Sequence, residues 1–290
     1  MKGTSASLGY VGSSTRGIVS DDYYNLPIFS QGGVRPNPAF GPIQLRGSCC
    51  HAHYNALQAN LRRPLGRGLD MNLHYTWAHS MDDIKGFSGN NDPGVTPQTN
   101  SLSLQRGNST FDIRHNFNAD FYYDLPLSGL QSHPGRLVKG WTLGGIVRAN
   151  TGPHYTVVTG GNVGDGVHTQ RPNSVCTDVR TSNATDLFSQ VLNRACFATP
   201  TVADPTTGFF VGTLGRNTLT APSVFTFDTY LQKNTRITER LTNQFRAEFF
   251  NLLNNTNWSQ PVSALNNPNF GRILGAGDAR QIQFALKLIW

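Results

Sequence analysis

The chain lacks any long hydrophobic run. None of its apolar stretches approaches the ~20 residues that a transmembrane helix needs, which excludes membrane proteins built from helices. Charge is also scarce, because Asp, Glu, Lys and Arg make up only 14% of the residues. Lys and Arg are scattered singly or in pairs, without the basic stripe and interleaved aromatics of a nucleic-acid-binding surface. The net charge of +7 therefore does not indicate a nucleic-acid partner.

Motifs of catalysis and export are missing as well. The sequence contains no G-x-S-x-G, H-E-x-x-H, P-loop or G-x-G-x-x-G pattern, so we expect neither an enzyme nor a cofactor. The opening residues MKGTSASLGYVG have no apolar core of the kind found in secretory leaders, so no signal peptide is predicted within the chain.

Turn formers and aromatic residues are plentiful. The 290 residues include 30 Gly, 16 Pro, 17 Phe and 9 Tyr, with a mean hydropathy of −0.34. So many aromatics argue against disorder, and polarity carried by Asn, Gln, Ser and Thr favours strands and turns over helices. A transmembrane β-barrel fits this composition, because its alternating strands keep the average hydropathy low.

Period-two alternation marks the candidate strands. In 69–80, Leu69, Leu73 and Trp77 lie on one face, whereas Asn72 and Thr76 lie on the other. Most segments run about ten residues, close to the ~9–11 that cross a bilayer as a tilted strand. The eight segments are 4–14, 52–63, 69–80, 111–124, 141–150, 223–234, 240–251 and 280–290.

The connections between these segments alternate between short and long. The short ones are 64–68, 125–140 and 235–239; the long ones are 15–51, 81–110, 151–222 and 252–279. All long loops must then emerge on one side, as in outer-membrane barrels. We predict an all-β fold: an antiparallel up-and-down transmembrane barrel segment of about eight strands with long extracellular loops. A short helix is expected at 184–193, and a soluble β-sandwich remains the alternative.

The polar faces of the predicted strands carry nearly all of their charge. In a barrel these faces would line the lumen, opposite an almost uncharged lipid-facing side. The lumen-facing charged residues predicted in this way are Asp112, Arg114, Asp120, Arg148, Arg246, Glu248 and Lys287.

The last strand, RQIQFALKLIW, places its apolar residues on one face and ends on an aromatic. This pattern resembles the signal that the barrel-assembly machinery reads in outer-membrane proteins, plausibly by strand addition. The residues are Ile282, Phe284, Leu286, Leu288 and Trp290. We predict that deleting Trp290 from a full-length parent would block membrane insertion, measured as outer-membrane abundance and heat-modifiable migration.

The four cysteines form two groups. Cys176 and Cys196 bracket a polar, loop-like segment, which favours a loop-stapling disulfide over free thiols. Cys49 lies next to Cys50, and no ring between these neighbours is expected.

Two polar clusters suggest metal binding. In CCHAH, Cys49, His51 and His53 share a side, but no second ligand pair follows to complete a zinc site, so a structural role is favoured. Asp82 and Asp83 could hold a cation, although a solvated loop start is the favoured interpretation.

Several longer stretches resemble a known family. They are HYNALQANLRRPLGRGLDMNLHYTWAHSMDD, RGNSTFDIRHNFNADFYYDLP, GWTLGGIVRANTGPHYTV, RITERLTNQFRAEFFNLLNNTNW and NPNFGRILGAGDARQIQFALKLIW. Together they are similar to the C-terminal barrel region of TonB-dependent receptors, in the Oar-like branch with a carboxypeptidase-regulatory-like N-terminal domain. The resemblance implies the bacterial outer membrane, with lipid, the barrel-assembly machinery and an unknown ligand as partners.

The same family implies parts that this chain does not contain. Its members carry a plug, a TonB box and a barrel of about 22 strands, the plugged-lumen class. Residues 1–290 therefore correspond to a C-terminal barrel portion, coupled to the TonB system only through the missing N-terminal part and not competent alone. Two alternatives remain open: a small self-closed eight-stranded barrel with a structural or adhesive role, and a secreted β-sandwich that binds carbohydrate.

Overall fold

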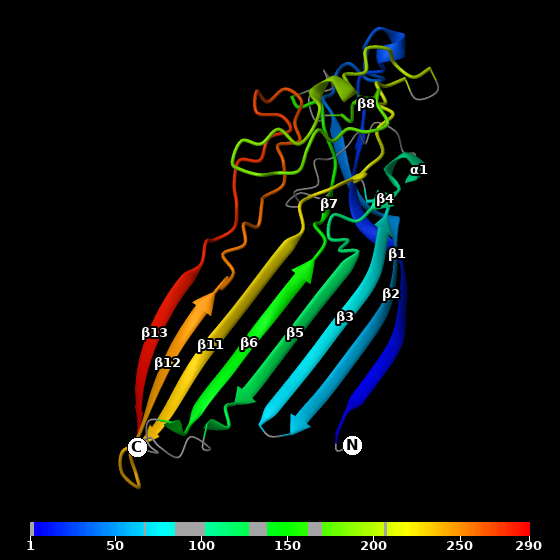
Figure 1. Cartoon of the computed structure of the whole chain (residues 1–290). Coiled ribbons are helices and arrows are strands. Elements are labelled where there is room, and N and C mark those ends of the chain that lie inside the picture. Colours follow the sequence, from blue (N-terminus) through cyan, green and yellow to red (C-terminus); the bar gives the residue numbers. More distant parts are fainter. Residues whose placement is uncertain (1–2, 67, 85–101, 128–137, 162–169, 206–207) are drawn as a thin grey trace.

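The computed structural model describes residues 3–66, 68–84, 102–127, 138–161, 170–205 and 208–290. One large antiparallel sheet runs through the chain, with its long strands in sequence order, β1-β2-β3-β5-β6-β11-β12-β13 (Figure 1). The strands are β1 (Ser5–Tyr24), β2 (Ile43–Gly66), β3 (Leu69–Asp82), β5 (His115–Asp124), β6 (Trp141–Asn150), β11 (Val224–Arg236), β12 (Thr242–Phe250) and β13 (Gln281–Ile289). The predicted antiparallel meander is confirmed.

Short and long connections lie at opposite ends of the sheet. The chain folds back within a few residues between β2 and β3 and between β11 and β12. The long connections gather at the other end, and both termini lie at the end with the short turns (Figure 1). Below, these are called the loop end and the turn end. Helical structure among the described residues includes α1 (Leu102–Gln105), η1 (Phe29–Gln31) and η3 (Arg194–Cys196), and no described helix has the length and apolar character to cross a membrane.

The sheet is open. The order of paired strands begins at β1 and ends at β13, and within the described residues these two edge strands do not pair with each other. β1 pairs with β2 from Ser5 to Tyr24, and β13 pairs with β12 from Gln281 to Ile289. Each edge strand therefore has one side of its backbone available for another strand.

The first hairpin is longer than predicted. β1 and β2 remain paired far beyond the predicted segments 4–14 and 52–63, so residues 25–42 form the loop instead of 15–51. The pairing register shifts around Gly17, which adopts a positive φ of 73°. Such a bulge shifts the alternation by one residue, so the period-two pattern breaks although the strand continues.

Two other predicted elements need correction. β5 begins at His115, not at residue 111, because Asp112 lies in a turn. The backbone N–H of Asp112 donates to the backbone oxygen of Ser109, and its carboxylate accepts a hydrogen bond from the backbone N–H of Ser80. The helix predicted at 184–193 is absent. The Ser189 hydroxyl donates to Asp186 Oδ1 and accepts from the Asp186 N–H, which stabilises a tight turn there.

Pairing register separates two faces of the sheet. Across β5, β6 and β11, Asp120 is opposite Ile146, which is opposite Asp228. On the other face, Phe121 and Phe227 lie with ring centroids 6.3 Å apart, and Phe245 and Phe284 stack at 6.2 Å. We call these the polar face and the apolar face.

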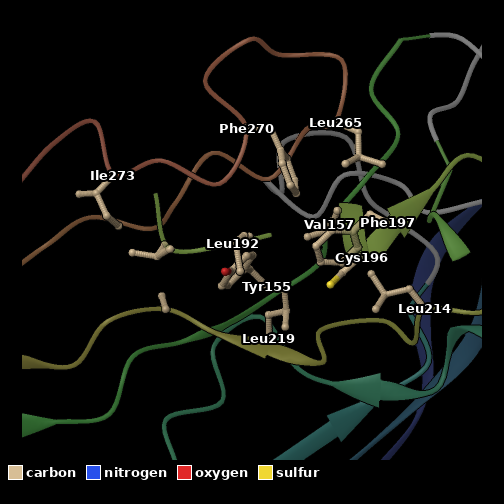
Figure 2. Close-up of a cluster of buried hydrophobic side chains, with 12 residues drawn as sticks. Tyr155, Val157, Leu192, Cys196, Phe197, Leu214, Leu219, Leu265, Phe270 and Ile273 are labelled. Atoms are coloured by element: carbon tan, nitrogen blue, oxygen red, sulfur yellow. The ribbon is translucent and has the colours of Figure 1, made fainter. Parts of the chain in front are cut away.

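The loop end carries its own hydrophobic core. We define the loop layer as the described residues of 151–222 and 252–279. Two pairs of short strands brace it: β7 (His154–Tyr155) with β10 (Leu219–Thr220), and β8 (Asn173–Ser174) with β9 (Phe197–Ala198). Its buried cluster, drawn in Figure 2, consists of Tyr155, Val157, Val191, Leu192, Cys196, Phe197, Leu214, Leu219, Ala221, Leu265, Phe270 and Ile273.

Candidate functional site

A buried ion pair anchors the loop layer to the rim of the sheet. Arg216 Nη1 lies 2.7 Å from Asp82 Oδ1, at the loop end of β3, and both side chains are at most 3% exposed. The same nitrogen also donates to the backbone oxygens of Asp82 and Gln105. Asp82 is therefore a structural partner of Arg216 and not the solvated loop residue that the sequence suggested.

A second buried carboxylate contacts the loop end of β3. Asp112, 1% exposed, has Oδ2 3.2 Å from His154 Nε2 and 3.4 Å from Arg114 Nη2. The prediction that Asp112 and Arg114 face a lumen from a strand is corrected, because both precede β5. Asp112 satisfies the backbone of Ser80 instead of facing water.

The pKa values of two loop-layer residues reflect their burial. Burial lowers the pKa of His154 below its ordinary value of 6.5, against the opposing effect of Asp112. Burial raises the pKa of Tyr155 to about 12, and Arg180 partly offsets this rise. Both side chains are therefore neutral near pH 7.

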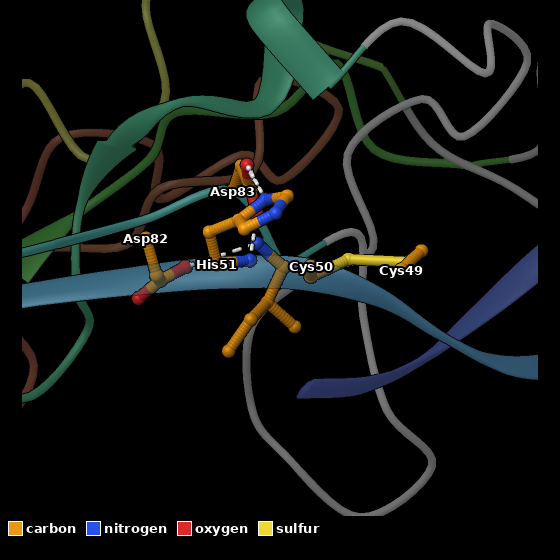
Figure 3. The surroundings of a disulfide bond; sticks show 6 residues. Cys49, Cys50, His51, Asp82 and Asp83 are labelled. Atoms are coloured by element: carbon orange, nitrogen blue, oxygen red, sulfur yellow. Dashed lines mark hydrogen bonds and ion pairs between the residues drawn. A yellow bond between two sulfur atoms is a disulfide. The ribbon is translucent and has the colours of Figure 1, made fainter. Parts of the chain in front are cut away.

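Two adjacent cysteines form a disulfide in β2, in the part of the strand that precedes the predicted segment 52–63. Cys49 and Cys50 are bonded, which corrects the expectation that these neighbours do not form a ring. Figure 3 draws the ring beside His51, whose backbone N–H donates to Asp83 Oδ1 at 2.6 Å while Nδ1 lies 3.2 Å from Asp83 Oδ2. Asp83 is 8% exposed and tied to His51, so it is not a solvated loop residue.

The other disulfide staples the loop layer. Cys176 and Cys196 are bonded with their Cα atoms 5.0 Å apart, the pairing that the sequence favours. Cys196 is also part of the buried cluster, so the bond ties an exposed segment to the core of the layer.

The register places the remaining predicted charges on the polar face. Arg148 is opposite Asn118 and Thr226, and Lys287 is opposite Gln244. The predicted residues that the register places on this face are Asp120, Arg148, Arg246, Glu248 and Lys287.

Specific contacts order part of this row. Arg246 Nε lies 2.8 Å from Glu248 Oε1, and its guanidinium carbon lies 4.0 Å above the Tyr230 ring. Tyr230 in turn lies over Gly144, where an added Cβ would come within 2.5 Å of the ring. Asn72 donates to Asp120 at 2.7 Å. The polar face thus carries two ordered groups of side-chain contacts, one around Arg246 and one at Asp120.

The predicted assembly signal lies on the apolar face of the edge strand. Ile282, Phe284, Leu286 and Leu288 alternate with the polar-face residues of β13, and all four are at least half exposed. Trp290 follows the strand and is 91% exposed. Recognition by assembly machinery stays a prediction.

A cleft in the loop layer was not foreseen from the sequence. Its lining includes Arg180, Tyr155, Ser223 and Trp258, and its volume is about 420 Å³. These residues belong to separate segments of irregular backbone, so no periodicity or motif signals their convergence.

An open antiparallel meander with a charged polar face, an apolar opposite face and one-sided loops defines a segment of an outer-membrane β-barrel. The chain belongs to the outer membrane beta barrel domain family, whose model matches residues 1–283. It is a protein of the bacterial outer membrane. No curated protein sequence matches it.

Two solved structures are similar in fold. The outer membrane transporter YddB from Escherichia coli matches with a TM-score of 0.52 and 12% identity, over 99% of this chain and 30% of YddB. P. aeruginosa FpvA, solved bound to heterologous pyoverdines, matches with a TM-score of 0.47 and 13% identity, over 98% of this chain and 24% of FpvA. The chain spans less than a third of either protein.

Proposed function

We propose that this chain forms part of the barrel of a TonB-dependent outer-membrane receptor or transporter, for a ligand that remains unknown. The observation that carries the proposal is the open sheet, whose edge strands β1 and β13 do not pair with each other. A membrane-spanning sheet cannot leave backbone edges unpaired in lipid, so further strands must complete the barrel. The resemblance in sequence and the fold shared with a transporter support the same conclusion.

The two faces then take different surroundings. We place the apolar face against lipid, and the polar face with Arg148, Arg246 and Glu248 along the lumen. The loop layer would lie outside the cell, where disulfides are stable. A non-enzymatic role, and coupling to the TonB system through further segments, are parts of this proposal.

Cross-linking tests whether the sheet closes on itself. Leu8→Cys in β1, combined in turn with Phe284→Cys and Leu286→Cys in β13, should give no cross-link within one chain in isolated outer membranes. The matched control is Phe245→Cys with Leu286→Cys, because these residues are register partners in adjacent strands and should cross-link readily. A β1–β13 cross-link as efficient as the control would instead establish the small self-closed barrel.

Surface labelling tests the orientation. Asn183→Cys in the loop layer should react with a membrane-impermeant maleimide in intact cells, whereas Thr238→Cys at the turn end should react only after lysis. The opposite pattern would reverse the sheet and contradict the receptor proposal.

A further inference from the structure

The cleft in the loop layer has the dimensions of a ligand site. Its volume of about 420 Å³ falls within the ~300–1,000 Å³ typical of small-molecule pockets. Three segments supply most of the lining: 180–192, 220–225 and 255–261. The cleft therefore exists only when the two long connections that form the loop layer pack together.

The cleft lies partly against the buried core of the loop layer. Tyr155, Leu192 and Ala221 line it and also belong to the buried cluster of Figure 2, where each is at most 8% exposed. Trp258 packs against the same cluster and lines the cleft with part of its surface still exposed. Because these side chains are held by the core, a ligand would meet a preformed surface and lose little affinity to ordering it.

The walls carry neutral polar groups at the surface. Exposed hydroxyl and amide side chains surround the opening: Ser182, Asn183, Ser223, Asn255 and Thr256. Hydroxyls and amides both donate and accept hydrogen bonds, so they match a ligand that is itself rich in hydroxyl groups.

One positive charge lines the cleft. Arg180 and Tyr155 are the ionisable side chains among the described lining residues, and Tyr155 is neutral because its pKa is raised to about 12. No described carboxylate lies within 4.0 Å of the Arg180 guanidinium, which donates to the backbone oxygen of Thr220 and is thereby held across the cleft wall. Its other N–H groups are suited to a carboxylate, which arginine binds in a two-pronged manner.

We propose that this cleft binds an acidic saccharide, with the sugar ring against Trp258, its hydroxyls on the surrounding Ser, Thr and Asn side chains, and its carboxylate on Arg180. The absence of described acidic lining disfavours a cationic ligand, because nothing there would balance its charge. A peptide would instead use an unpaired sheet edge or an apolar groove, and the exposed lining here is side-chain hydroxyl and amide. Binding goes beyond the proposed function, since it holds whether or not the completed barrel transports anything.

Calorimetry on the purified full chain in detergent micelles tests the proposal, with trigalacturonate as the acidic probe and cellotriose as the neutral one. Trigalacturonate should bind about tenfold more tightly than cellotriose, the size of one charge-assisted contact. Arg180→Gln should remove that preference. Arg280→Gln is the matched control, because Arg280 lies outside the cleft, is also exposed and also donates to a backbone oxygen, that of Leu252. The Arg280→Gln variant should bind trigalacturonate with unchanged affinity.

The aromatic contact has its own test. Trp258→Ala should weaken both sugars about tenfold, whereas Trp258→Phe should retain most of the affinity. Limited proteolysis of the loop layer shows whether each variant is folded. If Trp258→Ala unfolds, Arg180→Gln still tests the proposal, because Arg180 is exposed and its substitution should not disturb the fold. The proposal would be overturned if trigalacturonate did not bind, or if Arg180→Gln left its binding unaffected. It would also be overturned if trialanine, a peptide probe, bound more tightly than trigalacturonate. Binding by this chain together with β1–β13 cross-linking would retain the cleft and reject the receptor proposal.

Discussion

The sheet and the loop layer are stabilised by different forces. In the sheet, backbone pairing runs along every long strand, yet Phe284 is 68% exposed and Leu8 70%. In the loop layer, regular strands are only two residues long, yet Leu192 and Ile273 are almost completely buried. Between its two edge strands the sheet pairs its backbone internally and leaves its apolar side chains exposed, whereas the loop layer buries its own, as a water-soluble domain does.

This difference predicts how each region responds to substitution. A side chain of the loop core should matter through the cavity that it leaves, and an apolar-face side chain of the sheet should matter little to the loop layer. Four predictions use this contrast, in decreasing order of expected effect.

Phe270→Ala should have the largest effect. Phe270 is 2% exposed and packs edge-on against Phe197 at 5.5 Å, so its truncation should destabilise the loop layer by about 3–5 kcal/mol. The measurement is the denaturant midpoint for protease protection of the loop layer. Phe284→Ala, the matched change on the apolar face, should leave that midpoint unchanged; equal effects would mean that the two regions unfold together.

Asp82→Asn should loosen the junction between the two regions. It removes the carboxylate that pairs with the buried Arg216, and breaking a buried pair costs about 3 kcal/mol or more. We expect earlier protease cleavage in 208–222 with unchanged heat-modifiable migration. The control is Glu248→Gln in the more exposed pair with Arg246, worth about 0–1 kcal/mol.

Removing the Cys176–Cys196 bond should act on the loop layer alone. For two cysteines 20 residues apart, the loss is on the order of 3 kcal/mol. Cys176→Ser, which avoids placing a hydroxyl in the core at Cys196, should lower the denaturant midpoint of the loop layer without altering the sheet. If the sheet lost its heat-modifiable migration as well, the disulfide would support the whole fold.

Acidification should have the smallest effect, through His154. Burial lowers its pKa in the folded protein, so the unfolded chain takes up a proton at a pH where the folded chain does not. Loop-layer stability should therefore fall as the pH drops below about 6.5, and His154→Asn should reduce this dependence. Among its neighbours, Asp112 raises the pKa of His154, whereas Arg114 and His79 lower it. If the dependence of stability on pH were unchanged in His154→Asn, another titrating group would be responsible for it.

Strands of the sheet were predictable because their chemistry is periodic. A strand with one polar and one apolar face must alternate, so the segments at 69–80 and 141–150 could be located almost to the residue. Reliance on periodicity also explains why the loop at 15–51 was predicted too long. The bulge at Gly17 shifts the alternation by one residue, so the pattern stops marking a strand that continues. The polar row from Asp120 to Lys287 followed from that periodicity.

The loop layer was not predictable in this way. Its partners are far apart in sequence, as with Asp82 and Arg216, or Asp112 and His154, and each pair forms only after the loops have packed. The turn at Asp186–Ser189 replaced a predicted helix because local side-chain hydrogen bonds stabilise it. The ring between Cys49 and Cys50 also depends on the conformation of their chain, which residue type does not specify.

The sequence by itself determined most of the strand segments, their antiparallel order, the one-sided loops and the separation of charged from apolar faces. Each of these depends on neighbours along the chain and on a period of two, which a single sequence records directly. Tertiary structure alone decided the open sheet, the buried ion pairs at the rim and the cleft that joins Arg180 to Trp258. Those features arise from contacts between distant segments of irregular backbone, where position in the chain carries no information about proximity in space.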